Sequence, residues 1–278
     1  QRRGSQRRVI DEDIEANLNL ADADEEDEDP DEDNGTDIDN LPTESPMGQL
    51  LEAIRARLLM EINQQRTGPA INPWLVPYLK NHNFWIRAEA AQFICKKLKI
   101  ESGKLGYYKG VKVWLPEIQW GPDCTPCCVR CGESKSVGNH GFDKDAQRLV
   151  VGLQANYYII TRRWKCHACK VNFWAWHTNC LRKLPCMKVC EFPALLTHRS
   201  AIDKEVLSLI RALCPEGTRC EHISNLLREL HSKEFDRLRL LDACEELKKT
   251  QVNPLHDPSP FSLFRERDRL EKCPHETS

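Results

Sequence analysis

The 278-residue sequence has no apolar run of about eighteen residues or more, so no membrane-spanning helix is predicted. It also lacks a glycine-rich phosphate loop, a nucleophile elbow and a His-Glu-x-x-His zinc motif. These motifs mark nucleotide-binding enzymes, hydrolases and metalloproteases. Their absence leads us to expect a protein that is not an enzyme.

Acidic residues are missing from residues 146–190, although the whole chain contains 42 Asp and Glu. Lysines, arginines and aromatic residues are interleaved along the same stretch. One interpretation is a small aromatic core with a solvated charged face. The other is a surface that binds nucleic-acid phosphates, with exposed Trp or Tyr stacking on unpaired bases. The cations expected to contact DNA are Arg162, Arg163, Lys165, Lys170, Arg182 and Lys183.

The net charge of −2 hides a strong asymmetry along the chain. Residues 1–46 carry four Arg against 17 Asp and Glu, whereas the remainder carries 36 Lys and Arg against 25 acidic residues. The acidic segment cannot bury enough apolar surface to offset the entropy of ordering, so we expect a disordered tail. It is either a solvated tail, or an arm that competes with nucleic acid or docks on a basic partner.

Two C-x-x-C pairs stand out among the 14 cysteines, and this spacing favours metal binding in a reducing compartment over disulfides. The run RLVVGLQANYYIITRR between the pairs is typical of strand, turn and strand. A hairpin of this kind brings two cysteine turns together into the four-thiolate cage that Zn²⁺ prefers. The predicted ligands are Cys128, Cys131, Cys166 and Cys169.

The ligand assignment has alternatives. Cys124 and Cys127 form a second C-x-x-C, but we prefer Cys128 and Cys131 because Gly132 follows directly and can adopt a positive φ. The first pair is either spare or binds a second ion with other thiols or His140. A separate constellation of suitable residue types is formed by His177, Cys180, Cys186 and Cys190.

The expected fold class is α+β, with a zinc ribbon joined to a small helical bundle. We predict an acidic tail at 1–46, a helical segment at 47–104, a zinc-ribbon domain at 105–200, a helical bundle at 201–250 and a linker or tail at 251–278. Residues 47–65 have apolar residues at helical spacing, which predicts a helix that packs on the body or on a partner protein.

Three helices are predicted in the bundle, at 201–214, 221–231 and 233–250, and the last is expected to bury Phe235, Leu238, Leu241 and Leu247. A short turn containing Gly217 separates the first two. This arrangement resembles a helix-turn-helix, but we favour ordinary helical packing under the ribbon. In the DNA-binding interpretation, the second helix presents Arg219, His222, Asn225 and Arg228.

The order of several motifs resembles an uncharacterised cysteine-rich family. The motifs are VWLPE (Val113–Glu117), a CxxCG turn, NYYIITRRWKCHAC (Asn156–Cys169), Leu184–Pro185 and FPALLTHRSAID (Phe192–Asp203). The family occurs in transposon-derived eukaryotic proteins and accompanies Kyakuja-Dileera-Zisupton transposases, often beside an exonuclease-like domain. The resemblance covers about residues 114–231 and implies a zinc-binding, DNA-associated module with Cys128, Cys131, Cys166 and Cys169 as ligands.

We therefore expect a non-catalytic zinc-binding module that binds DNA in the nucleus. The alternative is a protein-interaction module with zinc as its scaffold, which would dock through the 47–65 helix or the acidic tail. No membrane association is expected. A catalytic role is the third hypothesis, and it requires an open coordination position at the metal.

Overall fold

The computed structural model describes residues 44–67, 72–143, 147–197, 200–214 and 217–252. The expected acidic tail and C-terminal linker lie almost wholly outside these residues. Helices and sheets both occur, as the α+β prediction requires. The chain divides into two compact units. We call residues 114–150 and 161–204 the cysteine unit, and the described parts of 40–113, 151–160 and 205–278 the helical unit.

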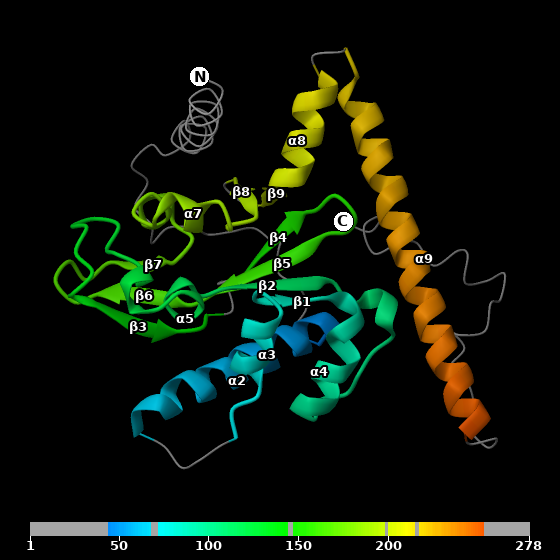
Figure 1. The fold of residues 1–278 in the computed structure, drawn as a ribbon, viewed down its shortest axis with the longest axis horizontal. Coiled ribbons are helices and arrows are strands. Elements are labelled where there is room, and N and C mark those ends of the chain that lie inside the picture. The colour runs from blue at the N-terminus through cyan, green and yellow to red at the C-terminus, as the bar shows by residue number, and fades with distance from the viewer. Residues whose placement is uncertain (1–43, 68–71, 144–146, 198–199, 215–216, 253–278) are drawn as a thin grey trace, which may run out of the picture. The chain divides into compact units, whose positions relative to one another are not determined.

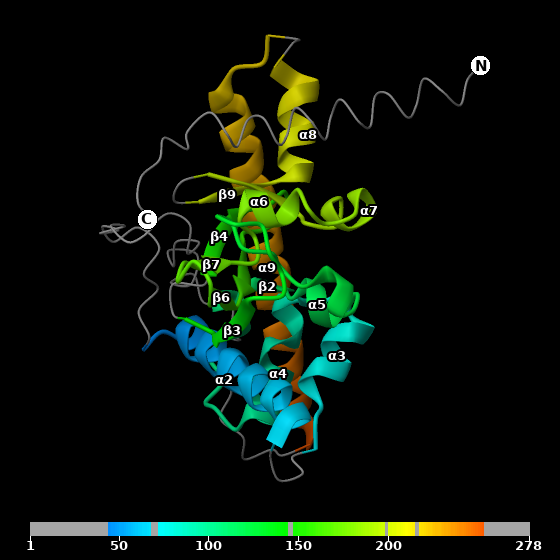
Figure 2. The same ribbon diagram turned by 90° about the vertical axis from the view of Figure 1, so that its left-hand side faces the viewer.

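Three helices of the helical unit pack together. Helix α2 (Pro46–Thr67) contacts α3 (Leu75–Asn81) and α4 (Ala91–Leu98), and the three are grouped in Figure 2. The carboxylate of Glu61 on α2 accepts hydrogen bonds from the first backbone amides of α3, those of Leu75 at 3.1 Å and Val76 at 2.9 Å. This carboxylate satisfies amides that a helix start leaves without partners. The buried apolar side chains of α2 are Met47, Leu50, Leu51, Ile54 and Leu58.

Three neighbouring strands lie in the same unit. Strand β1 (Trp85–Ile86) pairs antiparallel with β2 (Gly110–Trp114), which in turn neighbours β5 (Tyr157–Thr161). Two 3₁₀ turns, η1 (Ala88–Ala90) and η2 (Leu105–Tyr107), connect these elements to the helices. The β-branched and aromatic residues of β5 are all buried, as expected for a strand inside a sheet.

The C-terminal part begins with α8 (Lys204–Leu213) and ends with α9 (Cys220–Val252), which Figure 1 shows as one unbroken helix. The prediction of separate helices at 221–231 and 233–250 is therefore wrong. Only Ser232 lies between them, and residues 220–252 include neither Gly nor Pro, so nothing stops the helix. No helix in the described part of the chain is long and apolar enough to cross a membrane.

Helix α9 buries a different face from the one expected. Phe235 and Leu238 are buried as predicted, but Leu241 and Leu247 are 37% and 62% exposed. The buried face includes polar residues at helical spacing. These are His231, Asp242 and Glu246.

Short strands make up most of the cysteine unit. Strands β3 (Val137–Gly141), β6 (Arg163–Cys166) and β7 (Asn172–Trp174) form an antiparallel sheet in that order. Strand β4 (Gln147–Val151) neighbours β9 (Ala201–Asp203), which pairs with β8 (Ala194–Leu196). Four short helical turns complete the unit, namely α5 (Pro116–Gln119), η3 (Pro122–Cys124), α6 (Thr178–Leu181) and α7 (Cys186–Val189).

The predicted hairpin between the cysteine pairs is only partly correct. Strands β4 and β5 form at the expected residues, but neither ends at a cysteine. The cysteine turns are instead brought together by β6 pairing with β3 and β7, two strands that sequence reasoning missed. Strand β3 contains two glycines and β7 has only three residues, so neither shows a strand-like apolar alternation.

Candidate metal centre

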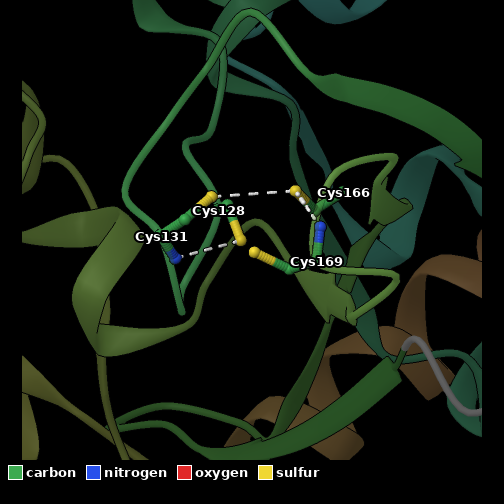
Figure 3. Close-up of side chains that lie close together, drawn as sticks. All are labelled: Cys128, Cys131, Cys166 and Cys169. Carbon is green, nitrogen blue, oxygen red and sulfur yellow. Dashed lines mark hydrogen bonds between the residues drawn. The ribbon is translucent and has the colours of Figure 1, made fainter.

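Four cysteine side chains converge in the cysteine unit, as Figure 3 shows. The sulfurs of Cys128, Cys131, Cys166 and Cys169 all lie within 4.8 Å of one another. The Sγ atoms of Cys131 and Cys166 are 3.8 Å apart. Cys128 and Cys166 are buried, whereas Cys131 and Cys169 lie nearer the surface. The structure thus gathers the four residues predicted as ligands into a group that could hold a metal ion.

The first cysteine turn is closed by backbone hydrogen bonds. The amide of Cys128 donates to the carbonyl of Glu133, and the amide of Gly132 donates to the carbonyl of Cys128, both at 2.9 Å. The amides of Arg130 and Cys131 point at Cys128 Sγ, at 3.4 and 3.5 Å. Gly132 has a φ of 75°, which is the conformation that favoured Cys128 and Cys131 over the preceding pair.

The second cysteine turn repeats this backbone pattern. The amide of Cys166 donates to the carbonyl of Val171, and the amide of Lys170 donates to the carbonyl of Cys166, both at 2.9 Å. The amide of Cys169 points at Cys166 Sγ at 3.4 Å. Both turns therefore direct backbone amides at the sulfur of their first cysteine.

Sheet register explains why the two turns meet. Val137 of β3 lies opposite Cys166 of β6, and the amide of His167 donates to the carbonyl of Ser136 at 2.8 Å. The first turn leads directly into β3, and the second connects β6 with β7. Pairing of these strands therefore carries both turns to the same end of the sheet.

Crowding of the thiols disfavours ionisation of Cys169. The pKa of Cys169 is raised to about 12, chiefly by its hydrogen bond with Cys131, followed by burial and by Cys166 and Cys128. A divalent cation placed among the sulfurs reverses this effect, because it deprotonates its thiol ligands. The arrangement is suited to cation binding and offers four sulfur ligands.

The other cysteines and histidines considered as ligands lie outside this cluster. Cys124, Cys127 and Cys180 are buried, and His177 is half-buried at the start of α6. Cys186 and Cys190, at the two ends of α7, are exposed, as is His140 on β3. Within the described residues, the structure does not gather His177, Cys180, Cys186 and Cys190 into one group.

Arg162, predicted as a DNA contact, lies inside the cysteine unit. Its side chain is buried, pairs with the Glu117 carboxylate at 2.8 Å and stacks over the Trp164 ring at 4.2 Å. Burial raises the pKa of Glu117, against the opposing effect of the Arg162 charge. The pair is part of the core, so Arg162 does not present its charge at the surface. No sequence pattern predicts this pairing, because the two residues lie far apart along the chain.

The other predicted cations differ in their exposure. Arg163 pairs with Asp143 at 2.9 Å and is half-buried, as is Lys165. Lys170, Arg182 and Lys183 are exposed, and Lys183 Nζ donates to the carbonyl of Gly132 at 3.0 Å. That contact places Lys183 beside the first cysteine turn, while Lys170 belongs to the second.

The aromatic residues of this stretch are mostly inside. Tyr157, Tyr158, Trp164, Phe173 and Trp176 are all buried, and only Trp174 is half-exposed. Stacking on unpaired bases therefore has little support from the structure. The residues proposed for a helix-turn-helix contact are all exposed near the start of α9, namely Arg219, His222, Asn225 and Arg228.

One family of known proteins matches the chain. Its description is a domain of unknown function (DUF6729), and the match covers residues 90–273, which include all four clustered cysteines. Searches of curated proteins and of solved structures found no match.

Proposed function

The chain belongs to the DUF6729 family, and we propose that it is a non-catalytic module that binds DNA and is held together by a structural zinc ion. The transposon-derived context and the nuclear location suggested by the motif resemblance stay predictions within this proposal, because the family description refers to neither.

Zinc is supported by the ligand set and its spacing. An ion about 2.3 Å from four tetrahedral sulfurs holds those sulfurs about 3.8 Å apart. The Cys131 and Cys166 sulfurs are 3.8 Å apart. Four thiolates suit zinc better than magnesium or calcium, which prefer oxygen ligands. A site of four thiolates has no coordination position for water, which supports a structural role over a catalytic one.

DNA binding is supported mainly by one observation: exposed cations from a stretch without carboxylates accompany both cysteine turns, although the exposed Glu133 follows the first turn. Lys170 belongs to the second turn, and Lys183 contacts the first. Residues 147–190, to which both lysines belong, include no Asp or Glu. Lysines and arginines on such a surface displace counterions from phosphates, which favours binding that depends on charge rather than on base sequence.

The test is a salt titration of DNA binding by the zinc-loaded 278-residue chain. We expect affinity for duplex or single-stranded DNA to fall steeply with salt. On duplex DNA, the logarithm of the binding constant should fall with the logarithm of the salt concentration by a slope of about 0.9 per phosphate contact. The triple variant Lys170→Gln/Arg182→Gln/Lys183→Gln should bind more weakly and with a smaller slope.

The matched control removes three positive charges from the helical unit. Lys80→Gln/Lys96→Gln/Lys99→Gln changes exposed lysines of that unit and leaves the cysteine unit intact. It should lose much less affinity than the first triple variant. Absence of salt-dependent binding, or equal losses in the two variants, would contradict the proposed DNA surface.

A protein-interaction role is the second candidate, and α9 supplies the observation that favours it. Leu226, Leu240 and Leu247 on this helix are 40%, 51% and 62% exposed. The 47–65 segment is less suited to docking, because the apolar face of α2 is already buried in its own unit. A partner recovered by pull-down that survives nuclease, and is lost in Leu240→Lys/Leu247→Lys, would favour this role.

A further inference from the structure

We propose a second metal site in the cysteine unit, formed by Cys124, Cys127, His177 and Cys180. This site goes beyond the single structural zinc and is independent of DNA binding. Its ligand set of three thiolates and one imidazole is a standard tetrahedral zinc set.

Residue spacing points to these four. Within 124–180, four pairs of Cys or His residues are separated by two intervening residues. Two of them, Cys128–Cys131 and Cys166–Cys169, form the cluster described above. The remaining two are Cys124–Cys127 and His177–Cys180, which flank the first cluster on either side along the chain.

Hydrogen bonds show that these two flanking segments lie against each other. Cys180 Sγ donates to the carbonyl of Cys127 at 3.1 Å, and Cys127 Sγ donates to the carbonyl of Asn179 at 3.9 Å. The Asn179 side chain also donates to the carbonyl of Val129 at 3.4 Å. The Cys127 and Cys180 thiols are close enough to interact directly.

Burial separates these thiols from the exposed alternatives. Cys124 and Cys127 are each 6% exposed and Cys180 is 3% exposed. By contrast, Cys186 and Cys190 are exposed. Exposure does not by itself exclude a ligand, because Cys131 of the first cluster is also exposed, so burial adds to the contacts between the two segments rather than replacing them. The structure therefore favours Cys124 and Cys127 over Cys186 and Cys190 as partners of His177 and Cys180.

The position of His177 in its turn resembles that of Cys128, the first ligand of the neighbouring cluster. It precedes α6, and its Nδ1 accepts a hydrogen bond from the amide of Asn179, two residues ahead, at 3.2 Å. The amide of Arg130 points in the same way at Cys128 Sγ, the first ligand of the neighbouring cluster, at 3.4 Å. In the second site, the metal takes the Nδ1 lone pair in place of that amide hydrogen.

The second site is less tightly gathered than the first. Among the described residues, the first cluster is the one set of ligand atoms that converges within 4.8 Å. The Cys127 and Cys180 thiols instead donate to backbone carbonyls of the facing segment. Because S–H groups are weak donors, rotation of these side chains toward a cation exchanges weak hydrogen bonds for metal–thiolate bonds, and each thiol proton is released to solvent.

The first measurement is the zinc content of the 278-residue chain by native mass spectrometry. We expect two ions in the parent protein and one in Cys127→Ser/Cys180→Ser. The matched control, Cys186→Ser/Cys190→Ser, should keep both. A parent with a single ion, or a control that loses one, would overturn the proposal.

The second measurement uses a variant that preserves the number of ligands, in case the serine variant does not fold. His177→Cys should keep two ions and, when loaded with Co²⁺, show stronger thiolate-to-cobalt absorption than the parent. Unchanged absorption would show that residue 177 is not a ligand and would overturn the proposed set of four ligands.

These results separate the two proposals. If the parent chain binds a single ion and Cys166→Ser removes it, the second site is refuted and the proposed structural zinc site stands. A chain that binds no zinc would refute both sites. Loss or retention of DNA binding has no bearing on the second site.

Discussion

Gly132 and Lys170 occupy the same position in the two cysteine turns. Each is the first residue after a C-x-x-C pair, each donates its amide to the carbonyl of the first cysteine, and each has a positive φ, of 75° and 64°. Glycine adopts this conformation without strain, whereas a residue with a Cβ does not. The two turns therefore share a backbone but differ in strain.

This difference predicts opposite effects of two substitutions. Lys170→Gly should stabilise the zinc-loaded chain by about 0.5–1 kcal/mol because it relieves left-handed strain. Gly132→Ala should destabilise it by about 1 kcal/mol for the converse reason. Denaturant unfolding of the zinc-loaded protein measures both.

Lys170→Ala is the control for charge, since it removes the ammonium group and keeps a Cβ at positive φ. Its stability should stay near that of the parent. If Lys170→Ala stabilises the chain as much as Lys170→Gly does, then charge repulsion rather than backbone strain acts at this position.

The buried Glu117–Arg162 pair gives a second prediction. Glu117→Leu leaves the Arg162 guanidinium buried without its partner and should destabilise the chain by about 3–5 kcal/mol. The double variant Glu117→Leu/Arg162→Met removes both charges and should recover most of that loss. Thermal or denaturant unfolding of the three proteins measures the difference.

The half-exposed pair Arg163–Asp143 provides the comparison. Asp143→Asn should cost less than about 1 kcal/mol, because water screens this pair. Similar losses in Glu117→Leu and Asp143→Asn would mean that the Glu117–Arg162 pair is not held in a dry core.

The sequence was sufficient to predict the cysteine cluster, because ligand spacing is a local property. The sequence also indicates Cys128 rather than Cys124 as a ligand, because Gly132 marks the turn that needs a positive φ. The strands that join the turns were not predictable in the same way. Strand β3 is held by pairing with β6 and not by its own β propensity, which its two glycines lower.

Arg162 and α9 show why sequence patterns alone do not distinguish buried residues from exposed ones. A run of cations without carboxylates looks exposed, but Glu117, which pairs with Arg162, is 45 residues away along the chain. On α9, the buried face includes His231, whose ring contacts the carbonyl of Gly152 at 2.8 Å. Counting apolar residues alone selects Leu241 and Leu247, which lie outside that face.

Asp242, on the buried face of α9, gives a prediction about pH. Burial raises its pKa, while the hydrogen bond from the Gln92 amide, at 3.0 Å, opposes that rise. A carboxyl whose pKa is higher in the folded state binds its proton more tightly there. Its contribution to stability therefore falls as pH rises from the ordinary value of 3.8 through the folded pKa.

Asp242→Asn keeps an oxygen that accepts from Gln92 and removes the charge. The variant should be more stable than the parent at pH 7, and the difference should disappear below about pH 4, where the parent carboxyl is protonated. Unfolding of both proteins across this pH range measures the difference in stability. Acid release of metal affects both proteins alike and therefore cancels in that difference. A gain that is the same at all pH values would show that the buried charge is not its cause.

Loss of metal should affect the cysteine unit directly, because structural zinc contributes on the order of 10 kcal/mol of folding free energy in isolated zinc-finger peptides. The most direct test is native mass spectrometry of the 278-residue chain and of Cys128→Ser/Cys166→Ser, which removes one thiol from each turn. We predict that the parent contains zinc and that the variant contains at least one ion fewer. Equal zinc content in the two proteins, or no zinc in the parent, would contradict the assignment of this cluster as a zinc site.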